Sequence, residues 1–357
     1  MVYVQQLWLQ NFRNYSEANL SISPGQILVV GDNGQGKSNL LEAIGYLGTA
    51  KSFRGIPADA LIKQDCDNAI IRAEVSHTGR DLLVEVEISR THQNKIFVNK
   101  QKISPLRNLI GMIPTTIFGP DDLDLIKNGP SVRRAYLDDL LVQLHPKNIQ
   151  LRADLEQVLK QRNALLKQAR GRLTDDIAVT LEVWNDKFHH LSHQWGKARQ
   201  KIVNDINSFA ADSYMELAGV PSPLKLIYDP EWLEHGLLEV LKLQEKDELR
   251  RGTSLVGPHR DEITITLSGL PARTHASQGE QRTIALSLRI AGHELLKETH
   301  NTNPLLLLDD VFSELDMKRA KRLLKLLVAD QTFISTAIAP EETSEGTQIY
   351  INKGQIL

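Results

Sequence analysis

The stretch from Gln26 to Leu41, QILVVGDNGQGKSNLL, constrains the fold more than any other part of the sequence. Four apolar residues run into a glycine-rich loop that ends in Lys37 and Ser38, the pattern G-x-x-x-x-G-K-[ST]. Glycines there let backbone N–H groups surround a phosphate chain, while the lysine reaches the β- and γ-phosphates and the hydroxyl ligates Mg²⁺. An ordinary strand-to-helix turn is the alternative. Because Lys and Ser directly follow the second glycine, the stretch favours polyphosphate binding in an α/β fold.

Composition sets broad limits on the class of protein. The 357 residues are long for one compact domain and suggest about two, and 41% hydrophobic with 24% charged residues is typical of a globular protein. A net charge of −2 excludes a generally basic surface, so any nucleic-acid contact requires a local patch. Cys66 is the only cysteine, which excludes an internal disulfide and fits a reducing cytosol.

The N-terminal residues and the hydropathy pattern bear on location. The sequence MVYVQQLWLQNFRNY alternates in polarity and lacks a basic region followed by an apolar segment, so we expect no signal peptide. No run of about 18 apolar residues occurs that could span a membrane. We therefore expect a cytoplasmic protein without a membrane partner.

The first part of the chain has the alternating polarity of half-buried strands. We expect strands at 2–9, 18–22, 69–75, 82–88 and 95–98, with a helix at 39–48 after the glycine-rich loop. Lys51 and Arg54 follow that helix, where they either meet a phosphate or face solvent.

From Ser131 to about Phe209 the pattern becomes helical. Two series repeat at spacings of three and four, which predicts two packed helices joined at 171–176. The first series is Leu151, Leu155, Val158, Arg162, Leu165 and Ala169; the second is Trp184, Phe188, Leu191, Trp195, Ala198 and Ile202. We expect an antiparallel helical arm at 113–209, inserted between two parts of one head domain, 1–112 and 210–357.

The arm's charge and histidines leave alternatives open. Residues 147–207 hold 11 Lys and Arg against 7 Asp and Glu, which suits nucleic acid but also an ordinary solvated helix surface. His189 and His193 lie one helical turn apart, as metal ligands can, but no HExxH pattern accompanies them. Surface histidines are the favoured interpretation.

Two later segments complete the pattern of an ATPase. Ser277 and Glu280 have the S-x-x-E spacing of a helix capping box, which alone explains both residues. Further on, an apolar strand at 305–308 ends in Asp309 and Asp310 and is followed by Ser-Glu-Leu-Asp. Such a strand supplies a carboxylate on the Mg²⁺ side, Asp309, and a candidate water-activating base, Asp310. The order of these motifs is that of ABC-type ATPases.

The resemblance extends to one family. The sequence blocks that carry it, in chain order, are NFRNY at 11–15, GDNGQGKSN at 31–39, KSFR at 51–54, FGPDDL at 118–123, Arg133-Arg134 with Leu137-Asp138, GPHRDE at 257–262, ASQGEQRT at 276–283 and LLLLDDVFSELD at 305–316. Together they resemble the RecF family of bacterial recombination mediators, across most of the chain.

This resemblance implies an ABC-type P-loop ATPase head of mixed sheets and helices, whose two copies dimerise with ATP on duplex or gapped DNA. It further implies that RecO and RecR act with the protein in loading RecA, and roles in DNA replication, DNA recombination, DNA repair and the SOS response. ATP and Mg²⁺ would be the cofactors, and the ATPase a weak, DNA-stimulated switch.

The motifs transfer to numbered residues. The nucleotide would be held by Gly31, Asp32, Asn33, Gly34, Gln35, Gly36, Lys37, Ser38 and Asn39, and by Ser277, Gln278 and Gly279 of a partner copy. Ser38 and Asp309 would hold Mg²⁺, and Lys37 and Asp310 would serve catalysis. Candidate contacts to DNA phosphates are Lys51, Arg54, Arg133 and Arg134.

Three departures from the pattern of ABC-type ATPases are visible. Asp310 stands where most of them have glutamate, and the shorter side chain favours slow turnover. No histidine follows the last core strand in the segment 336–340, and no Q-loop glutamine is clear near Phe118.

Two other functions share parts of the pattern. A transporter's nucleotide-binding subunit has the same ATPase order but needs no long arm. A small-molecule kinase would use the phosphate loop alone, with Ser277 and Asp309 in structural roles.

Overall fold

The structure, a computed structural model, describes residues 1–327, 329–337 and 346–357. The chain divides into two compact units. Unit 1 holds Met1–Leu123, Asp212–Pro221 and Arg282–Leu357, and unit 2 holds Asp124–Ala211 and Ser222–Gln281. The inserted part expected at 113–209 thus begins later in the structure and also includes the returning chain as far as Gln281.

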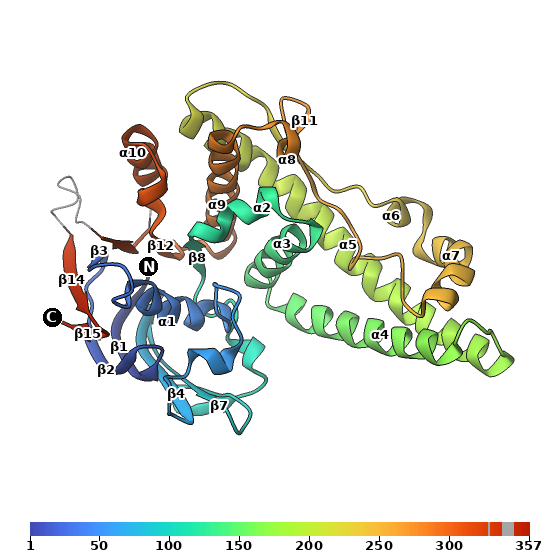
Figure 1. The fold of residues 1–357 in the computed structure, drawn as a ribbon, viewed down its shortest axis with the longest axis horizontal. Coiled ribbons are helices and arrows are strands. Elements are labelled where there is room, and N and C mark those ends of the chain that lie inside the picture. Colours follow the sequence, from blue (N-terminus) through green and yellow to red (C-terminus); the bar gives the residue numbers. More distant parts are fainter. Residues whose placement is uncertain (328, 338–345) are drawn as a thin grey trace. The chain divides into compact units, whose positions relative to one another are not determined.

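Unit 1 contains an antiparallel sheet built from alternating sequence. Its strands lie side by side in the order β2 (Tyr15–Ser21), β1 (Val2–Phe12), β4 (Asn68–His77), β5 (Arg80–Ser89), β6 (Lys95–Val98) and β7 (Gln101–Ile103) (Figure 1). Every second side chain is buried along the central parts of β4 and β5, and β1 has the same alternation apart from a register shift between Val4 and Gln6. This period of two places the apolar residues on one face of the sheet, as the sequence predicts.

A second sheet of unit 1 carries the phosphate loop. Its order is β15 (Gln355–Ile356), β14 (Thr347–Asn352), β3 (Gly25–Val30), β13 (Gln331–Thr336), β12 (Leu305–Asp309) and β8 (Thr115–Phe118). The five strands from β14 to β8 are parallel, and only β15 is antiparallel to its neighbour. The carboxyl ends of β3, β13 and β12 therefore meet at one edge. The alternating pattern of the sequence does not predict β8, β14 and β15.

Helices cover both faces of the parallel sheet. Helix α1 (Lys37–Thr49) packs through Leu40, Leu41 and Ile44 into a core that includes residues of β1, β3 and β12. On the other face, Leu286 and Ile290 of α9 (Gln278–His300) and Leu323 of α10 (Met317–Leu326) join the inner side chains of β3, β12 and β13. Short 3₁₀ turns complete the unit: η1 (Ala58–Leu61), η2 (Leu106–Leu109), η3 (Pro120–Leu123) and η4 (Val311–Glu314).

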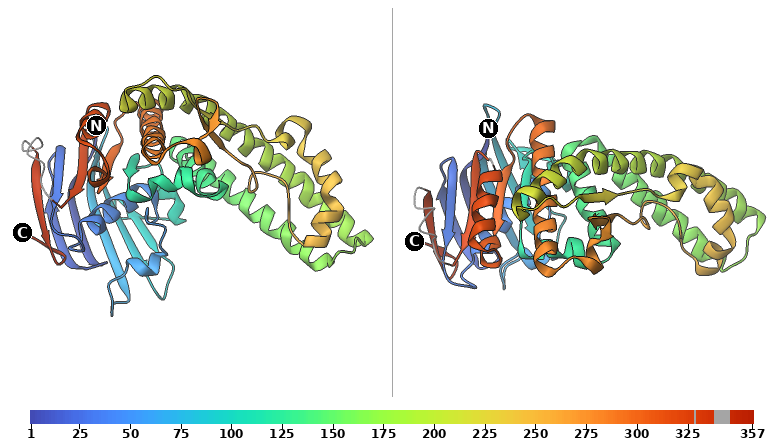
Figure 2. Two further views of the ribbon diagram at one scale, coloured as in Figure 1. Left: turned by 45° about the horizontal axis from the view of Figure 1, so that its top comes forward. Right: turned by 90° about the horizontal axis from the view of Figure 1, so that it is seen from above.

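Unit 2 is mainly helical. It comprises α2 (Asp124–Lys127), α3 (Pro130–Leu144), α4 (Lys147–Ala169), most of α5 (Asp175–Ala218), α6 (Glu231–His235), α7 (Leu237–Arg251) and α8 (Ala272–His275). A small antiparallel sheet has the order β11 (Leu270–Pro271), β10 (Thr264–Leu267) and β9 (Leu224–Ile227). Figures 1 and 2 show α4 and α5 running antiparallel, in green to yellow-green.

A further helix, α7, packs beside the two antiparallel helices that the sequence predicts. Gly236 separates α6 from α7, because an α-helix cannot contain its φ of 90°. Helix α7 packs on α4, because Leu249 joins Leu166 and Leu181 in one apolar cluster. The arginine that interrupts the first series, Arg162, is buried there and paired with a glutamate of α7.

Candidate nucleotide-binding site

The phosphate loop joins a central strand to a buried helix. Strand β3 ends at Val30, the loop follows, and α1 begins at Lys37 with Gly36 as its N-cap. Gly36 has a φ of 121° and would place a Cβ only 2.7 Å from the Asn14 amide, so a side chain is excluded there. The helix therefore begins with its N–H groups and its positive dipole end directed at the loop.

Lys37 holds the loop in a closed curve. The side chain is 7% exposed, and its ammonium donates to the carbonyl oxygens of Gly31 at 2.6 Å and Asp32 at 3.0 Å. A buried cation whose partners are only neutral carbonyls retains a positive charge that an anion can neutralise. This environment suits a phosphate ligand.

Ser38 and Asp309 meet although they are far apart in sequence. The Ser38 hydroxyl donates to Asp309 Oδ1 at 2.8 Å, and Ser335 at the end of β13 donates to the same oxygen at 2.7 Å. The parallel register pairs Asp309 with Ser335, which explains why the two side chains coincide. A hydroxyl and a carboxylate in contact offer the hard oxygen ligands that Mg²⁺ prefers.

Burial raises the pKa of Asp309 above its ordinary value. The hydrogen bonds from Ser335 and Ser38, and the charge of Arg54, oppose this shift, whereas the neighbouring Asp310 adds to it. Because the charged form is the disfavoured one, a cation bound beside Asp309 would stabilise the ionised carboxylate.

Asp310 lies at the edge of a small cavity. Its φ of 53° is left-handed, and its backbone N–H donates to Ser335 Oγ at 2.9 Å. The cavity, about 40 Å³, is also lined by Gly119 and Asp122. Asp122 is buried, accepts from the Gly119 N–H at 3.0 Å and from Arg289 Nε at 2.8 Å. A carboxylate thus occupies the segment near Phe118 where no Q-loop glutamine was found.

Sequence reasoning missed the residues that support the loop from outside. Asn14 Nδ2 donates to the Gln35 carbonyl at 2.8 Å, and Asn14 Oδ1 accepts from Asn39 Nδ2 at 2.8 Å. The Tyr15 hydroxyl donates to the Gly36 carbonyl at 2.9 Å. In the sequence, the block NFRNY carries only the family resemblance, and Asn14, in the turn between β1 and β2, gives no chemical signal.

The C-terminal hairpin also contacts the loop. The N–H of Gly354 donates to the Gln35 carbonyl at 2.9 Å, and the N–H of Lys353 donates to Gln35 Oε1 at 2.7 Å. A Cβ on Gly31 would collide with the carbonyl oxygen of Ile351 in β14. Gly31 is therefore required by the neighbouring strand as well as by any phosphate.

The segment 51–54 lies beside the beginning of α1. Arg13 pairs with Glu42 of α1 at 2.7 Å, and Glu42 also accepts from the Ser52 hydroxyl. Arg54 is exposed and its guanidinium reaches Asn39 Oδ1 at 3.4 Å. The candidate DNA contacts Lys51 and Arg54 are thus both exposed, with Arg54 directly beside the nucleotide-binding loop.

The serine motif lies in unit 2. The Ser277 hydroxyl and the Ser277 N–H both donate to Glu280 Oε2 at 2.7 Å. The Glu280 N–H donates to Ser277 Oγ at 3.3 Å. Gln281 Nε2 fixes the preceding turn by donating to the carbonyls of Arg273 and Ala276. Ser277 and Gln278 are exposed, so forming the capping box leaves these residues accessible to a ligand.

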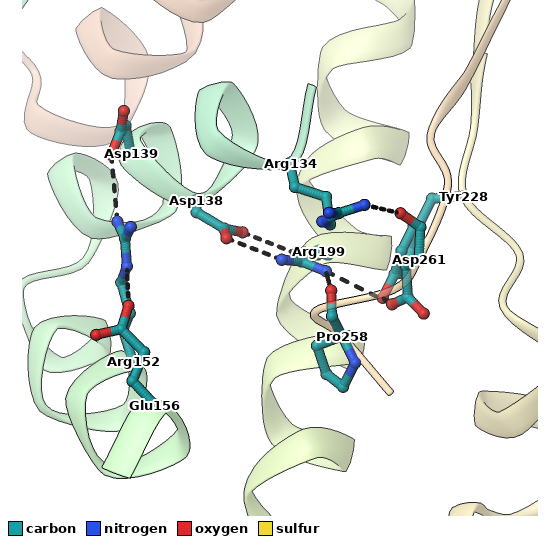
Figure 3. Close-up of polar contacts among 9 residues, drawn as sticks. All are labelled: Arg134, Asp138, Asp139, Arg152, Glu156, Arg199, Tyr228, Pro258 and Asp261. Atoms are coloured by element: carbon teal, nitrogen blue, oxygen red, sulfur yellow. Dashed lines mark hydrogen bonds and ion pairs between the residues drawn. The ribbon is translucent and has the colours of Figure 1, made fainter. Parts of the chain in front are cut away.

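Arg133 and Arg134 have internal partners within unit 2. Arg133 is 7% exposed and pairs with Glu262 at 2.8 Å, and Arg134 donates to the Asp261 carbonyl at 2.7 Å. Figure 3 shows Arg134 and Arg199 both contacting Asp261, in the segment GPHRDE at 257–262. These arginines therefore hold the GPHRDE segment against α3 and α5, and Arg133 presents no exposed cation to a phosphate.

The carboxylate of Asp261 is the centre of this buried network. It accepts from the Tyr228 hydroxyl at 2.6 Å and from Trp232 Nε1 at 2.7 Å. Arg199 forms a bidentate pair with Asp138, at 2.7 and 2.8 Å, and donates to the Pro258 carbonyl (Figure 3). Burial raises the pKa of Asp261, and the donors around it oppose that shift. The network links α3, α5 and the segment 257–262 within unit 2.

Three further features of the sequence concern a metal site, a membrane-spanning helix and the segment after the last core strand. The rings of His189 and His193 lie 6.3 Å apart, and among the described residues no group of three His, Cys, Asp or Glu side chains could hold a metal. In the part of the chain that the structure describes, no helix has the length and apolar content needed to cross a bilayer. The segment 338–340, which lacks the expected histidine, lies outside the described residues.

Comparisons with known proteins agree with this architecture. The family model for the RecF/RecN/SMC N-terminal domain matches residues 3–353. The DNA replication and repair protein RecF of Beutenbergia cavernae is 36% identical over 395 residues, covering 100% of this chain and 99% of that protein. RecF of Frankia alni is 37% identical over 378 residues, with 100% and 99% coverage.

Solved structures give the same result. A structure of the recombination mediator protein RecF with ATP, in the RecFOR pathway, matches with a TM-score of 0.92 at 30% identity, covering 100% of this chain and 97% of that one. The Smc head domain of Pyrococcus furiosus, bound to the C-terminal domain of ScpA, matches with a TM-score of 0.57 at 16% identity over 100% and 96% of the chains. The second likeness concerns the fold alone.

Proposed function

This chain belongs to the RecF family of DNA replication and repair proteins, and from that premise we propose that it is an ATP-switched DNA-binding protein. The observation that carries the proposal is the contact between Ser38 and Asp309 beside Lys37. Lys37 and Ser38 at the beginning of α1 and Asp309 at the end of β12 meet there, with the chemistry that a Mg²⁺–triphosphate requires.

Each of these residues would contact a different part of the Mg²⁺–triphosphate. Gly31 to Asn39 would surround the phosphates with N–H groups, and Lys37 would exchange its carbonyl partners for phosphate oxygens. Ser38 and Asp309 would hold Mg²⁺, which neutralises phosphate charge when bound. Asp310 would orient water. Its side chain is shorter than the glutamate of most ABC-type ATPases, which supports slow turnover in a switch.

Exposure of Ser277 supports the second half of the site. The residues Ser277, Gln278 and Gly279 begin α9, where N–H groups and the helix dipole favour an anion. We propose that they receive the γ-phosphate bound by another copy, so that two copies enclose two nucleotides. Only a ligand with a γ-phosphate makes that contact, and this difference is what lets ATP, and not ADP, favour the dimer.

Family membership supports the biological setting. RecF relatives are named as DNA replication and repair proteins, and the solved RecF structures are described within the RecFOR pathway. We propose that this protein acts in the cytoplasm on duplex or gapped DNA, together with RecO and RecR, in loading RecA and in the SOS response. Lys51 and Arg54 are the proposed phosphate contacts near the nucleotide. Full-length similarity to RecF leaves the transporter subunit without a supporting observation.

The test is binding of duplex DNA with ATP, with ADP and without nucleotide, each at two salt concentrations. We expect tight, salt-sensitive binding with ATP alone, because DNA affinity through phosphates falls with salt. Light scattering should show dimers with ATP that the Lys37→Met and Ser277→Arg variants do not form. DNA affinity that is independent of nucleotide, or normal dimers in both variants, would refute the switch.

A further inference from the structure

Helix α10 in unit 1 has an unusual composition. Five of its ten residues, Met317 to Leu326, are basic and none is acidic. The basic residues are Lys318, Arg319, Lys321, Arg322 and Lys325. In a chain whose net charge is −2, this concentration of cations on one short helix is a local patch of the kind that a phosphate backbone requires.

The helix is fixed by its apolar side. Leu323 is fully buried in the core formed by β3, β12 and β13, and Leu324 and Leu326 pack against the same core. Since residues three and four apart share a face, the positions 318, 321, 322 and 325 must point the other way. All four are exposed.

Two of the arginines have structural roles and three lysines make up the outer surface. Arg322 donates to the Leu217 carbonyl at 3.0 Å, and Arg319 lies 3.5 Å from Asp316. Lys318, Lys321 and Lys325 are exposed along the outer side of the helix, and we name them the α10 lysine row. At 1.5 Å rise per residue the row is about 10 Å long, which matches roughly three phosphates of one DNA strand.

We propose that the α10 lysine row binds the phosphate backbone of duplex DNA. This inference rests on the proposed function and locates a DNA contact that the sequence motifs did not indicate. Met317 is the only large apolar side chain of α10 that is strongly exposed, so the surface lacks the apolar centre typical of a protein interface. Lysines on flexible stems bind phosphates as point charges and do not read bases.

The position of α10 connects this surface to the nucleotide site. The chain runs from Asp309 and Asp310 through η4 to Asp316, the N-cap of α10. The Asp316 carboxylate accepts from the N–H groups of Lys318 and Arg319, both at 3.0 Å. A shift of the segment after Asp310 on nucleotide binding would therefore move the first turn of α10 and its lysines with it.

The experiment replaces the row by glutamine: Lys318→Gln, Lys321→Gln and Lys325→Gln in one protein. The matched control removes the same charge from exposed positions of the antiparallel sheet, with Arg80→Gln, Lys100→Gln and Lys102→Gln. Duplex DNA binding is measured with ATP from about 0.05 to 0.5 M salt. A third protein, with arginine at all three row positions, keeps the charge.

We expect the row variant to lose DNA affinity by roughly a hundredfold at about 0.1 M salt, and its log–log salt slope to fall by about 2 to 3. The arginine protein and the sheet control should bind like wild type, and all should dimerise with ATP. An unchanged slope in the row variant, or equal losses in row variant and sheet control, would overturn the inference. If wild type itself shows no ATP-dependent DNA binding, the proposed function fails instead.

Discussion

Asp309 is a buried carboxylate whose ionised form is unfavourable when no cation is bound. Its side chain is only 3% exposed, and two serine hydroxyls donate to one of its oxygens. Burial nevertheless leaves its pKa raised. The ionised form is therefore less stable in the folded protein than in the unfolded chain, so this residue reduces stability as pH rises through its folded pKa.

Replacing Asp309 by asparagine should therefore stabilise the protein without ligands while removing Mg²⁺-dependent nucleotide binding. The asparagine Oδ1 can still accept from Ser38 and Ser335, and no charge remains to be desolvated. We expect a higher midpoint of thermal unfolding at pH 8, and a gain that shrinks as pH falls and the wild-type carboxyl becomes protonated. Scanning calorimetry at pH 5 and pH 8 measures it; a lower midpoint at pH 8 would contradict this account.

Asn14 acts on the nucleotide through the loop it supports. Replacing it by alanine removes the donor to Gln35 and the acceptor for Asn39. Two lost hydrogen bonds of about 1 kcal/mol each predict ATP affinity lower by roughly tenfold or more, with little change in overall stability. Titration with a fluorescent ATP analogue gives the affinity, and far-ultraviolet circular dichroism checks the fold. Asn14→Asp keeps the acceptor for Asn39 but places a negative charge against the Gln35 carbonyl and beside the phosphates, so it should bind ATP no better than Asn14→Ala.

At the scale of elements, ion pairs decide how the arm is built. Arg162 of α4 and Glu248 of α7 are 1% and 0% exposed and lie 2.6 Å apart. Arg162 also donates to Asn185 of α5 at 2.8 Å, so one guanidinium on α4 contacts both α5 and α7. The apolar pattern of α4 shows this arginine only as an interruption.

Removing one partner of this pair should destabilise the arm strongly. Glu248→Ala leaves the Arg162 guanidinium buried without its counter-charge, which is expected to lower the free energy of unfolding by about 3 to 5 kcal/mol. Urea unfolding followed by tryptophan fluorescence measures the change. The double variant Arg162→Met with Glu248→Leu should recover most of it, because neither charge is then buried. A double variant as unstable as Glu248→Ala would exclude the ion pair as the cause.

For the whole molecule, features encoded by neighbouring residues could be predicted from the sequence, whereas contacts between residues far apart in the chain could not. Strand β3, its loop and α1 are encoded within 25 residues, and the strand ending at Asp309 is visible from four leucines alone. By contrast, the support from Asn14 and from Gly354 comes from 21 and 319 residues away along the chain from Gln35. The buried state of Arg133 depends on Glu262, 129 residues later, and nothing next to Arg133 indicates it.

The proposed dimer makes one prediction that only the assembled molecule can test. If each nucleotide is held by Lys37 of one copy and Ser277 of the other, then Lys37→Met and Ser277→Arg chains should complement each other. Their mixed dimer has one site with both residues intact and one site with neither. Neither variant alone has an intact site. We therefore expect light scattering with ATP to show dimers in the mixture, weaker than those of wild type, and none in the separate proteins.

The control places both substitutions in one chain and mixes it with wild type. That mixed dimer also contains two substitutions, but each site then lacks one residue, so the doubly substituted chain should stay out of ATP-dependent dimers. A fluorescent label on this chain distinguishes it from wild-type homodimers during size-exclusion chromatography. If Lys37 and Ser277 instead served one copy, the first mixture would contain no intact site and would form no dimers, whereas the control mixture would keep an intact site in its wild-type chain. Dimers in the first mixture, without recruitment of the labelled chain in the control, require that one phosphate be bound by both copies across the interface. The numbers and kinds of substitutions are the same in the two mixed dimers.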